Sequence, residues 1–144
     1  MDRLALDVVQ IQYGQHTYRA LGILINGERI EDLARVVEKP HAVAENNPKL
    51  AGDYAPLALS DIDSDRNHFL GHPVATWFED GDTVLMGCPC GEWGCWPLTV
   101  RVEVNSSTVR WHGFRNGHRE WDLSALGPFE FDRPEYEAAL KALA

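Results

Sequence analysis

The sequence lacks any apolar run that approaches the roughly 20 residues of a membrane-spanning helix. Its first residues also lack the charged segment and the following stretch of about 7–15 apolar residues that a secretory signal requires. Only three cysteines are present, so they cannot all pair within one chain, and a reducing compartment keeps them as thiols or ligands. These absences predict a cytoplasmic protein that does not use a membrane.

Positive charge is also scarce. Thirteen Lys and Arg residues oppose 22 Asp and Glu residues, which leaves a formal net charge of −9. Such a field repels phosphate backbones, so it disfavours nucleic-acid binding and favours a basic protein partner. The same charge also serves solubility, and this simpler explanation is the one we favour.

Familiar catalytic and nucleotide-binding motifs are missing: no Gly-x-Ser-x-Gly elbow, Walker loop or dinucleotide fingerprint occurs. Asp61, Asp63 and Asp65 occupy the first, third and fifth positions of a calcium-binding loop. However, Arg66 replaces the required glycine and His72 replaces the final glutamate. We therefore expect a solvated acidic loop and no calcium site.

Two histidines of the same region are spaced like zinc ligands on one face of a helix. His68 and His72 stand four residues apart, but Gly71 and Pro73 disfavour a continuous helix there. Both histidines are therefore predicted to lie in a solvent-exposed loop.

What the chain does contain is enough material for one core. It has 144 residues, of which 44% are hydrophobic, including five Trp, five Phe and four Tyr. A chain of this size buries roughly two thirds of its unfolded surface without disulfides. No internal repeat or low-complexity tract divides it. We expect a single domain over residues 1–144.

The N-terminal third predicts a β-hairpin followed by a helix. Leu4–Ile11 and Tyr18–Ile25 are rich in aliphatic and β-branched residues, and Gly14 lies between them. The dipeptide Asn26-Gly27 suits a second tight turn, which would pair Leu21–Ile25 with Glu28–Ile30. Apolar residues then recur at helical spacing, which predicts a short helix over 31–38 that ends before Pro40.

Residues 41–73 contain many turn-forming residues and are predicted to be largely irregular. The remainder predicts four antiparallel strands and a final helix over 133–143, with Asp132 as its N-cap. The predicted strands are Thr83–Gly87, Leu98–Val104, Thr108–Arg115 and His118–Leu123. The fold class is therefore α+β: an antiparallel β-sheet (a meander) with a short helix in the N-terminal half and a C-terminal helix packed on it.

The most unusual segment is the loop Gly87-Cys-Pro-Cys-Gly-Glu-Trp-Gly-Cys95. Its glycines allow tight turns, so the sulfurs of Cys88, Cys90 and Cys95 could converge on one point. Zinc requires four ligands in a tetrahedron, and no fourth cysteine exists. His112 or His118, from the neighbouring strands, would have to complete a zinc site.

Two other interpretations of this loop remain open. Thiol chemistry would use a pair of cysteines, and a disulfide between Cys90 and Cys95 would be less strained than one across the single residue between Cys88 and Cys90. Alternatively, the three cysteines are small buried hydrophobic side chains in a tight aromatic loop.

The segment 110–121 interleaves Arg and His with aromatic residues, as a platform for stacking nucleotides would. Because the whole chain is acidic, we favour a different arrangement. Trp111 and Trp121 are expected to face the core, while the arginines pair with carboxylates.

Over roughly residues 83–140, the chain resembles a family of small bacterial proteins of uncharacterised function. The resemblance is carried by Gly87-Cys-Pro-Cys-Gly-Glu-Trp-Gly-Cys-Trp-Pro97, Trp111, Trp121-Asp122 and Gly127-Pro-Phe-Glu-Phe-Asp132. It implies a single bacterial cytoplasmic domain and no particular activity.

The sequence therefore predicts a non-enzymatic binding or interaction domain with a basic partner. The alternative is a zinc-binding or thiol-dependent protein centred on Cys88, Cys90 and Cys95.

Overall fold

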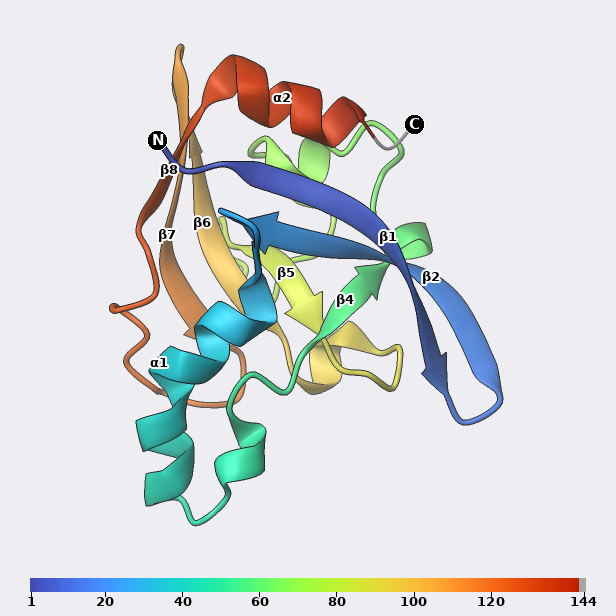
Figure 1. The fold of residues 1–144 in the computed structure, drawn as a ribbon, viewed down its shortest axis with the longest axis vertical. Coiled ribbons are helices and arrows are strands. Elements are labelled where there is room, and N and C mark those ends of the chain that lie inside the picture. The colour runs from blue at the N-terminus through green and yellow to red at the C-terminus, as the bar shows by residue number, and fades with distance from the viewer. Residues whose placement is uncertain (143–144) are drawn as a thin grey trace.

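The computed structural model describes residues 1–142 and confirms a mixed α+β fold built on one antiparallel sheet (Figure 1). The strands follow the order β1-β2-β4-β5-β6-β7-β8, and β3 pairs with β2. Their bounds are β1 Leu4–Tyr13, β2 His16–Ile25, β3 Glu28–Arg29, β4 Ala55–Ala58, β5 Thr83–Gly87, β6 Leu98–Val104, β7 Thr108–Asn116 and β8 Phe129–Asp132. Helix α1 spans Ile30–Ala44 and helix α2 spans Arg133–Lys141. Neither helix of this described part has the length and apolarity needed to cross a membrane.

The sheet curls until its two ends meet. The Asp2 N–H donates a hydrogen bond of 2.9 Å to the Glu130 carbonyl, and the Glu130 N–H donates one of 2.8 Å to the Asp2 carboxylate. An isolated parallel bridge joins Asp2 to Phe131 at the same place. The start of the chain is thereby fixed to β8, the last strand in the order.

The predicted N-terminal hairpin is confirmed, with β1 and β2 each two residues longer toward the turn than expected. Asn26 and Gly27 both take positive φ, 54° and 83°, and form the second turn as predicted. Strand β3 keeps only Glu28–Arg29, because Ile30 already begins α1.

Helix α1 is longer than the predicted 31–38 and includes Pro40 in its interior. A proline removes one helical hydrogen bond, but tertiary packing outweighs this cost here. Every fourth residue is buried, and the series Ile30, Ala34, Glu38 and Ala42 continues past Pro40. The same face is therefore covered along the whole helix, and beyond the first turns it packs on the segment that precedes β4, where the Glu38 carboxylate accepts the Gly52 N–H at 2.8 Å.

Residues 41–73 are not wholly irregular, because they contain β4. This strand pairs with β2 through Ala58 and Leu57 and with β5 through Ala55 and Pro56, so it connects the two halves of the sheet. Pro56 disfavours a strand in the sequence, and each ladder holds only two residue pairs. The sequence therefore did not predict β4, because local propensity disfavours it and its pairing with β2 and β5 stabilises it.

The predicted strand His118–Leu123 is wrong. The strand that pairs with β7 is β8, in which Phe131 lies opposite Val109 and is buried. Strand β7 ends at Asn116, whose buried side chain donates a 2.9 Å hydrogen bond to the Tyr54 hydroxyl. The other predicted strands of this region are confirmed.

Helix α2 covers one end of the sheet, and in Figure 1 it lies at the end opposite to α1. Asp132 caps it as predicted, because its carboxylate accepts the Glu135 N–H at 3.1 Å. Tyr136 of this helix is buried, and residue 143, the end of the predicted helix, lies outside the described residues.

The core contains a buried hydrogen-bonded chain of aromatic residues. The Trp111 ring N–H donates to the Tyr136 hydroxyl at 3.0 Å, and that hydroxyl donates to the Phe69 carbonyl at 2.6 Å. Trp111 is fully buried, as predicted, whereas Trp121 is only half-buried.

His68 is fully buried, which corrects the expectation of an exposed loop histidine, while His72 is exposed. The Nδ1 atom of His68 accepts the Val74 N–H at 3.1 Å, and the Nε2 atom of His68 lies 2.7 Å from the Val84 carbonyl. The carbonyl can only accept, so the proton is on Nε2 and the ring is neutral. Protonation of Nδ1 would break the bond from Val74.

We expect this burial to make stability depend on pH. Desolvation lowers the pKa of His68 below its ordinary value, so below about pH 6.5 the unfolded chain takes up a proton that the folded chain does not. The free energy of unfolding should therefore fall as the pH drops through that value. Denaturant titrations across this range should show a weaker fall for His68→Gln than for the wild type.

The contribution of His68 is the difference in the free energy of unfolding between the wild type and His68→Gln at each pH. Glu31 and Glu38 have pKa values raised by desolvation, which favours the folded state at low pH in both proteins alike. Parallel pH profiles for wild type and variant would contradict the assignment to His68.

Candidate thiolate metal site

The cysteine-bearing loop connects β5 to β6 and turns back on the end of β5. Its second half is a short 3₁₀ turn, Trp93–Cys95. A Cβ added to Gly87 would lie 2.4 Å from both Cα and Cβ of Trp93, so only glycine allows the turn to pack this closely on the strand. This close approach carries Cys95 back toward Cys88 and Cys90.

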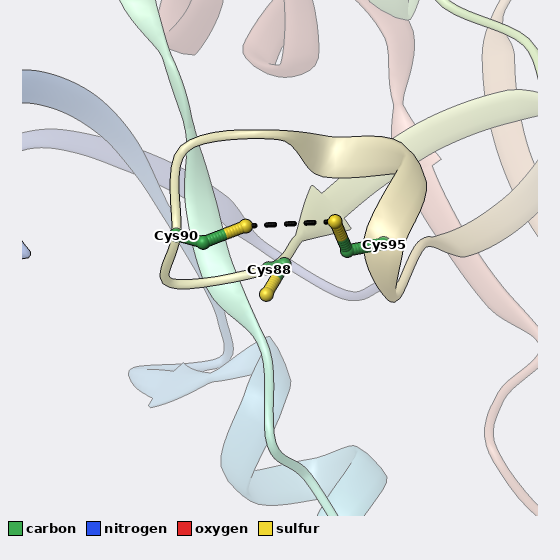
Figure 2. Close-up of side chains that lie close together, drawn as sticks. All are labelled: Cys88, Cys90 and Cys95. Atoms are coloured by element: carbon green, nitrogen blue, oxygen red, sulfur yellow. Dashed lines mark hydrogen bonds between the residues drawn. The ribbon is translucent and has the colours of Figure 1, made fainter.

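The three sulfurs do converge, as the loop composition predicts. The Sγ atoms of Cys88, Cys90 and Cys95 all lie within 4.8 Å of one another. Cys90 and Cys95 point toward each other across the loop with their sulfurs 3.6 Å apart, and the Cys88 sulfur lies to one side (Figure 2). Cys88 and Cys90 are half-buried and Cys95 is exposed, so the interpretation as buried hydrophobic side chains is wrong.

The backbone of the loop is held by two tight turns. The Cys88 carbonyl accepts the Gly91 N–H at 3.1 Å, and the Glu92 carbonyl accepts the Cys95 N–H at 3.1 Å. The thiol of Cys90 also points to the Glu92 carbonyl, at 3.8 Å. These bonds hold the backbone that carries the three sulfurs.

Glu92 is a site residue that sequence reasoning missed. One of its carboxylate oxygens, Oε2, lies 4.0 Å from Cys95 Sγ. Its position between Cys90 and Cys95 was the available signal, because a residue at the centre of so short a loop is held near both sulfurs.

The three thiols differ in how readily they lose a proton. A backbone hydrogen bond with Glu92, and then hydrogen bonds with the other thiols, hold the pKa of Cys90 below its ordinary value. The hydrogen bond with Cys90 raises the pKa of Cys95 to about 11, and desolvation raises the pKa of Cys88. Of the three thiols, Cys90 is therefore the one whose surroundings most favour the thiolate.

The two predicted histidine ligands lie outside the sulfur cluster. His112 on β7 places its Nε2 3.4 Å from the Glu103 carboxylate of β6. His118 lies beside the loop, where its Nε2 donates to the Gly94 carbonyl at 2.9 Å and its ring stacks on Trp96. The first histidine is thus occupied by an acidic partner and the second contacts the loop through its backbone. Their roles as ligands stay a prediction.

Aromatic side chains surround the loop. Trp77 packs against both Trp93 and His118, and Trp96 packs against Trp121. The Tyr18 hydroxyl of β2 also donates to the Pro89 carbonyl, at 3.4 Å. The loop is therefore braced by side chains from distant parts of the chain.

The arginines of segment 110–121 include two that pair with carboxylates, as predicted. Arg115 bonds Asp80 at 2.9 Å and lies over the Phe78 ring, and Arg119 bonds Glu45 at 2.9 Å. These pairs occupy the guanidinium groups that a phosphate would otherwise bind.

The chain matches no protein-family model, no curated protein and no solved structure. The family resemblance of the Cys-rich segment, and the bacterial cytoplasmic setting that it implies, stay predictions.

Proposed function

We propose that this protein is a non-enzymatic zinc-binding domain whose ligands are the thiolates of Cys88, Cys90 and Cys95. The observation that carries the proposal is the convergence of the three sulfurs within 4.8 Å of one another on a single braced loop. Thiolates are the ligands that zinc prefers in structural sites.

The spacing of the sulfurs fits such an ion. Two thiolates bound to one zinc at about 2.3 Å in a tetrahedron lie about 3.8 Å apart. The sulfurs of Cys90 and Cys95 are already 3.6 Å apart, so they need almost no movement. Cys88, within 4.8 Å of both, needs only a side-chain rotation to complete a face of the tetrahedron.

Two residues near the sulfurs are candidates for the fourth position. The Glu92 carboxylate is close to Cys95, and carboxylate oxygen is an accepted zinc ligand. His118 has its Nε2 occupied by Gly94, so it would have to bind through Nδ1 after its ring moves away from Trp96. We favour Glu92, because its side chain already lies at the sulfurs. Bound in this way, zinc would join the end of β5 to the start of β6.

The test is metal analysis of reduced protein purified without chelator. We expect about one zinc per chain, and each of Cys88→Ser, Cys90→Ser and Cys95→Ser should lower zinc affinity by more than the roughly 10–100-fold typical of losing an outer-shell partner. The matched control is His112→Gln, because His112 contacts Glu103 and not the loop. Zinc retained at full stoichiometry by all three serine variants would refute the proposal.

Cobalt identifies the fourth ligand in the same series. Its visible spectrum depends on the number and type of ligands. We expect Glu92→Gln to change the spectrum of the cobalt-substituted protein, and His118→Gln to leave it unaltered. The reverse result would assign the position to His118.

A further inference from the structure

The Cys90–Cys95 pair is arranged for a second chemistry. Their sulfurs lie 3.6 Å apart, and a disulfide bond is about 2.05 Å long, so bonding requires them to approach by about 1.5 Å. The loop contains glycines at 91 and 94, and Cys95 is exposed. Side-chain rotation and a small movement of the loop can therefore close the gap.

Cys88 is placed differently. In Figure 2 its sulfur lies away from the line between the other two. Its nearest cysteine in sequence is Cys90, across Pro89 alone, and a disulfide over so short and stiff a link is strained. The 3.6 Å contact between the sulfurs of Cys90 and Cys95 therefore favours this pair.

We propose that a hydroperoxide oxidises this loop by forming a disulfide between Cys90 and Cys95, and that this disulfide releases the metal. The release rests on the zinc site proposed above, whereas formation of the disulfide does not. Oxidation removes two of the three thiolate ligands, and Cys88 alone cannot hold zinc with the affinity of the complete set.

The chemistry balances in two steps. One sulfur of the pair attacks the terminal oxygen of the hydroperoxide, the O–O bond breaks, and the leaving oxygen takes the electron pair and a proton to become an alcohol, or water from hydrogen peroxide. The second sulfur then attacks the resulting sulfenic acid, the S–S bond forms, and the S–O bond breaks to release water. In total, two thiols lose two electrons and two protons, and the peroxide is reduced.

The first arm of the experiment uses metal-free, reduced protein treated with one equivalent of hydrogen peroxide. Intact mass should fall by two hydrogen atoms, and peptide mapping after alkylation should find Cys90 linked to Cys95 and Cys88 alkylated. Cys88→Ser should still lose two hydrogens, and Cys90→Ser and Cys95→Ser should not. A link to Cys88, a bond between two chains, or sulfinic acid without a disulfide would each overturn the proposal.

The second arm uses the zinc-loaded protein and a chromophoric chelator. Peroxide should release the bound zinc in step with disulfide formation, and a dithiol reductant should restore binding. Zinc that remains bound to the disulfide form would overturn the switch and leave the zinc site standing. Protein that never binds zinc would refute the proposed function, while the first arm would still decide the disulfide.

Trp93 and Trp96 supply an independent optical signal. They lie within or next to the loop and pack against its surroundings, and disulfides quench nearby indole fluorescence. We expect peroxide to lower tryptophan emission in the wild type and in Cys88→Ser, and to leave it unchanged in Cys95→Ser. An equal decrease in Cys95→Ser would show that the signal comes from oxidation elsewhere and would count against the assigned pair.

Discussion

Gly87→Ala should lower zinc affinity by more than tenfold, although residue 87 is not a ligand. The added Cβ would lie 2.4 Å from the Trp93 backbone, so either the 3₁₀ turn or the end of β5 must move. That movement carries Cys95 away from Cys88 and Cys90 and opens the metal site. Competition with a zinc chelator measures the loss, and denaturant titration should show a destabilisation of about 1–3 kcal/mol from overpacking.

The matched control is Gly94→Ala, in the same turn. A Cβ at Gly94 would lie 3.4 Å from the Trp77 ring, which is an ordinary van der Waals contact. This variant should retain zinc affinity close to that of the wild type. If both alanine variants lose affinity to the same extent, the close approach at Gly87 is not what positions the sulfurs.

Trp111→Ala should destabilise the folded protein by about 3–5 kcal/mol, which is a large part of the stability of a domain of this size. The ring extends from β7, is fully buried, and packs edge-to-face on Phe131 of β8 and Tyr136 of α2. Its removal leaves a cavity and deletes the hydrogen bond to Tyr136. Equilibrium unfolding in urea, followed by circular dichroism, measures the effect.

Trp111→Phe retains one six-membered aromatic ring in the core, but it removes the N–H donor and the rest of the indole, so it leaves a smaller cavity than alanine does. It should cost less than the alanine variant. Val36→Ala, at a position that is 76% exposed on α1, should change stability by less than about 0.5 kcal/mol. A cost for Trp111→Ala as small as that of Val36→Ala would show that this ring does not anchor the core.

Local signals in the sequence were sufficient for the elements that depend on local chemistry. Asn26-Gly27 specified its turn because both residues tolerate positive φ. Asp132 specified the start of α2 because its carboxylate accepts an N–H that the helix leaves free. Apolar and polar residues alternate along Leu98–Val104, and this period of two specified β6.

The site was predicted in part. The glycines and cysteines of residues 87–95 indicated that the sulfurs converge, and they do. The role of Glu92 and the bracing by Tyr18 were not visible, because they depend on where the loop backbone turns and on β2 approaching it. The basic partner, which was inferred from charge alone, stays a prediction.

The sequence by itself determined the α+β class, the first hairpin, most strands of the second half and the cysteine loop. Each of these depends on interactions between residues that are close along the chain. Tertiary structure alone decided that Pro56 lies in β4, that α1 continues past Pro40, that β8 replaces the strand expected at 118–123, and that His68 is buried. In each case the free energy of burying side chains against distant parts of the chain and of satisfying backbone hydrogen bonds exceeded the local preference.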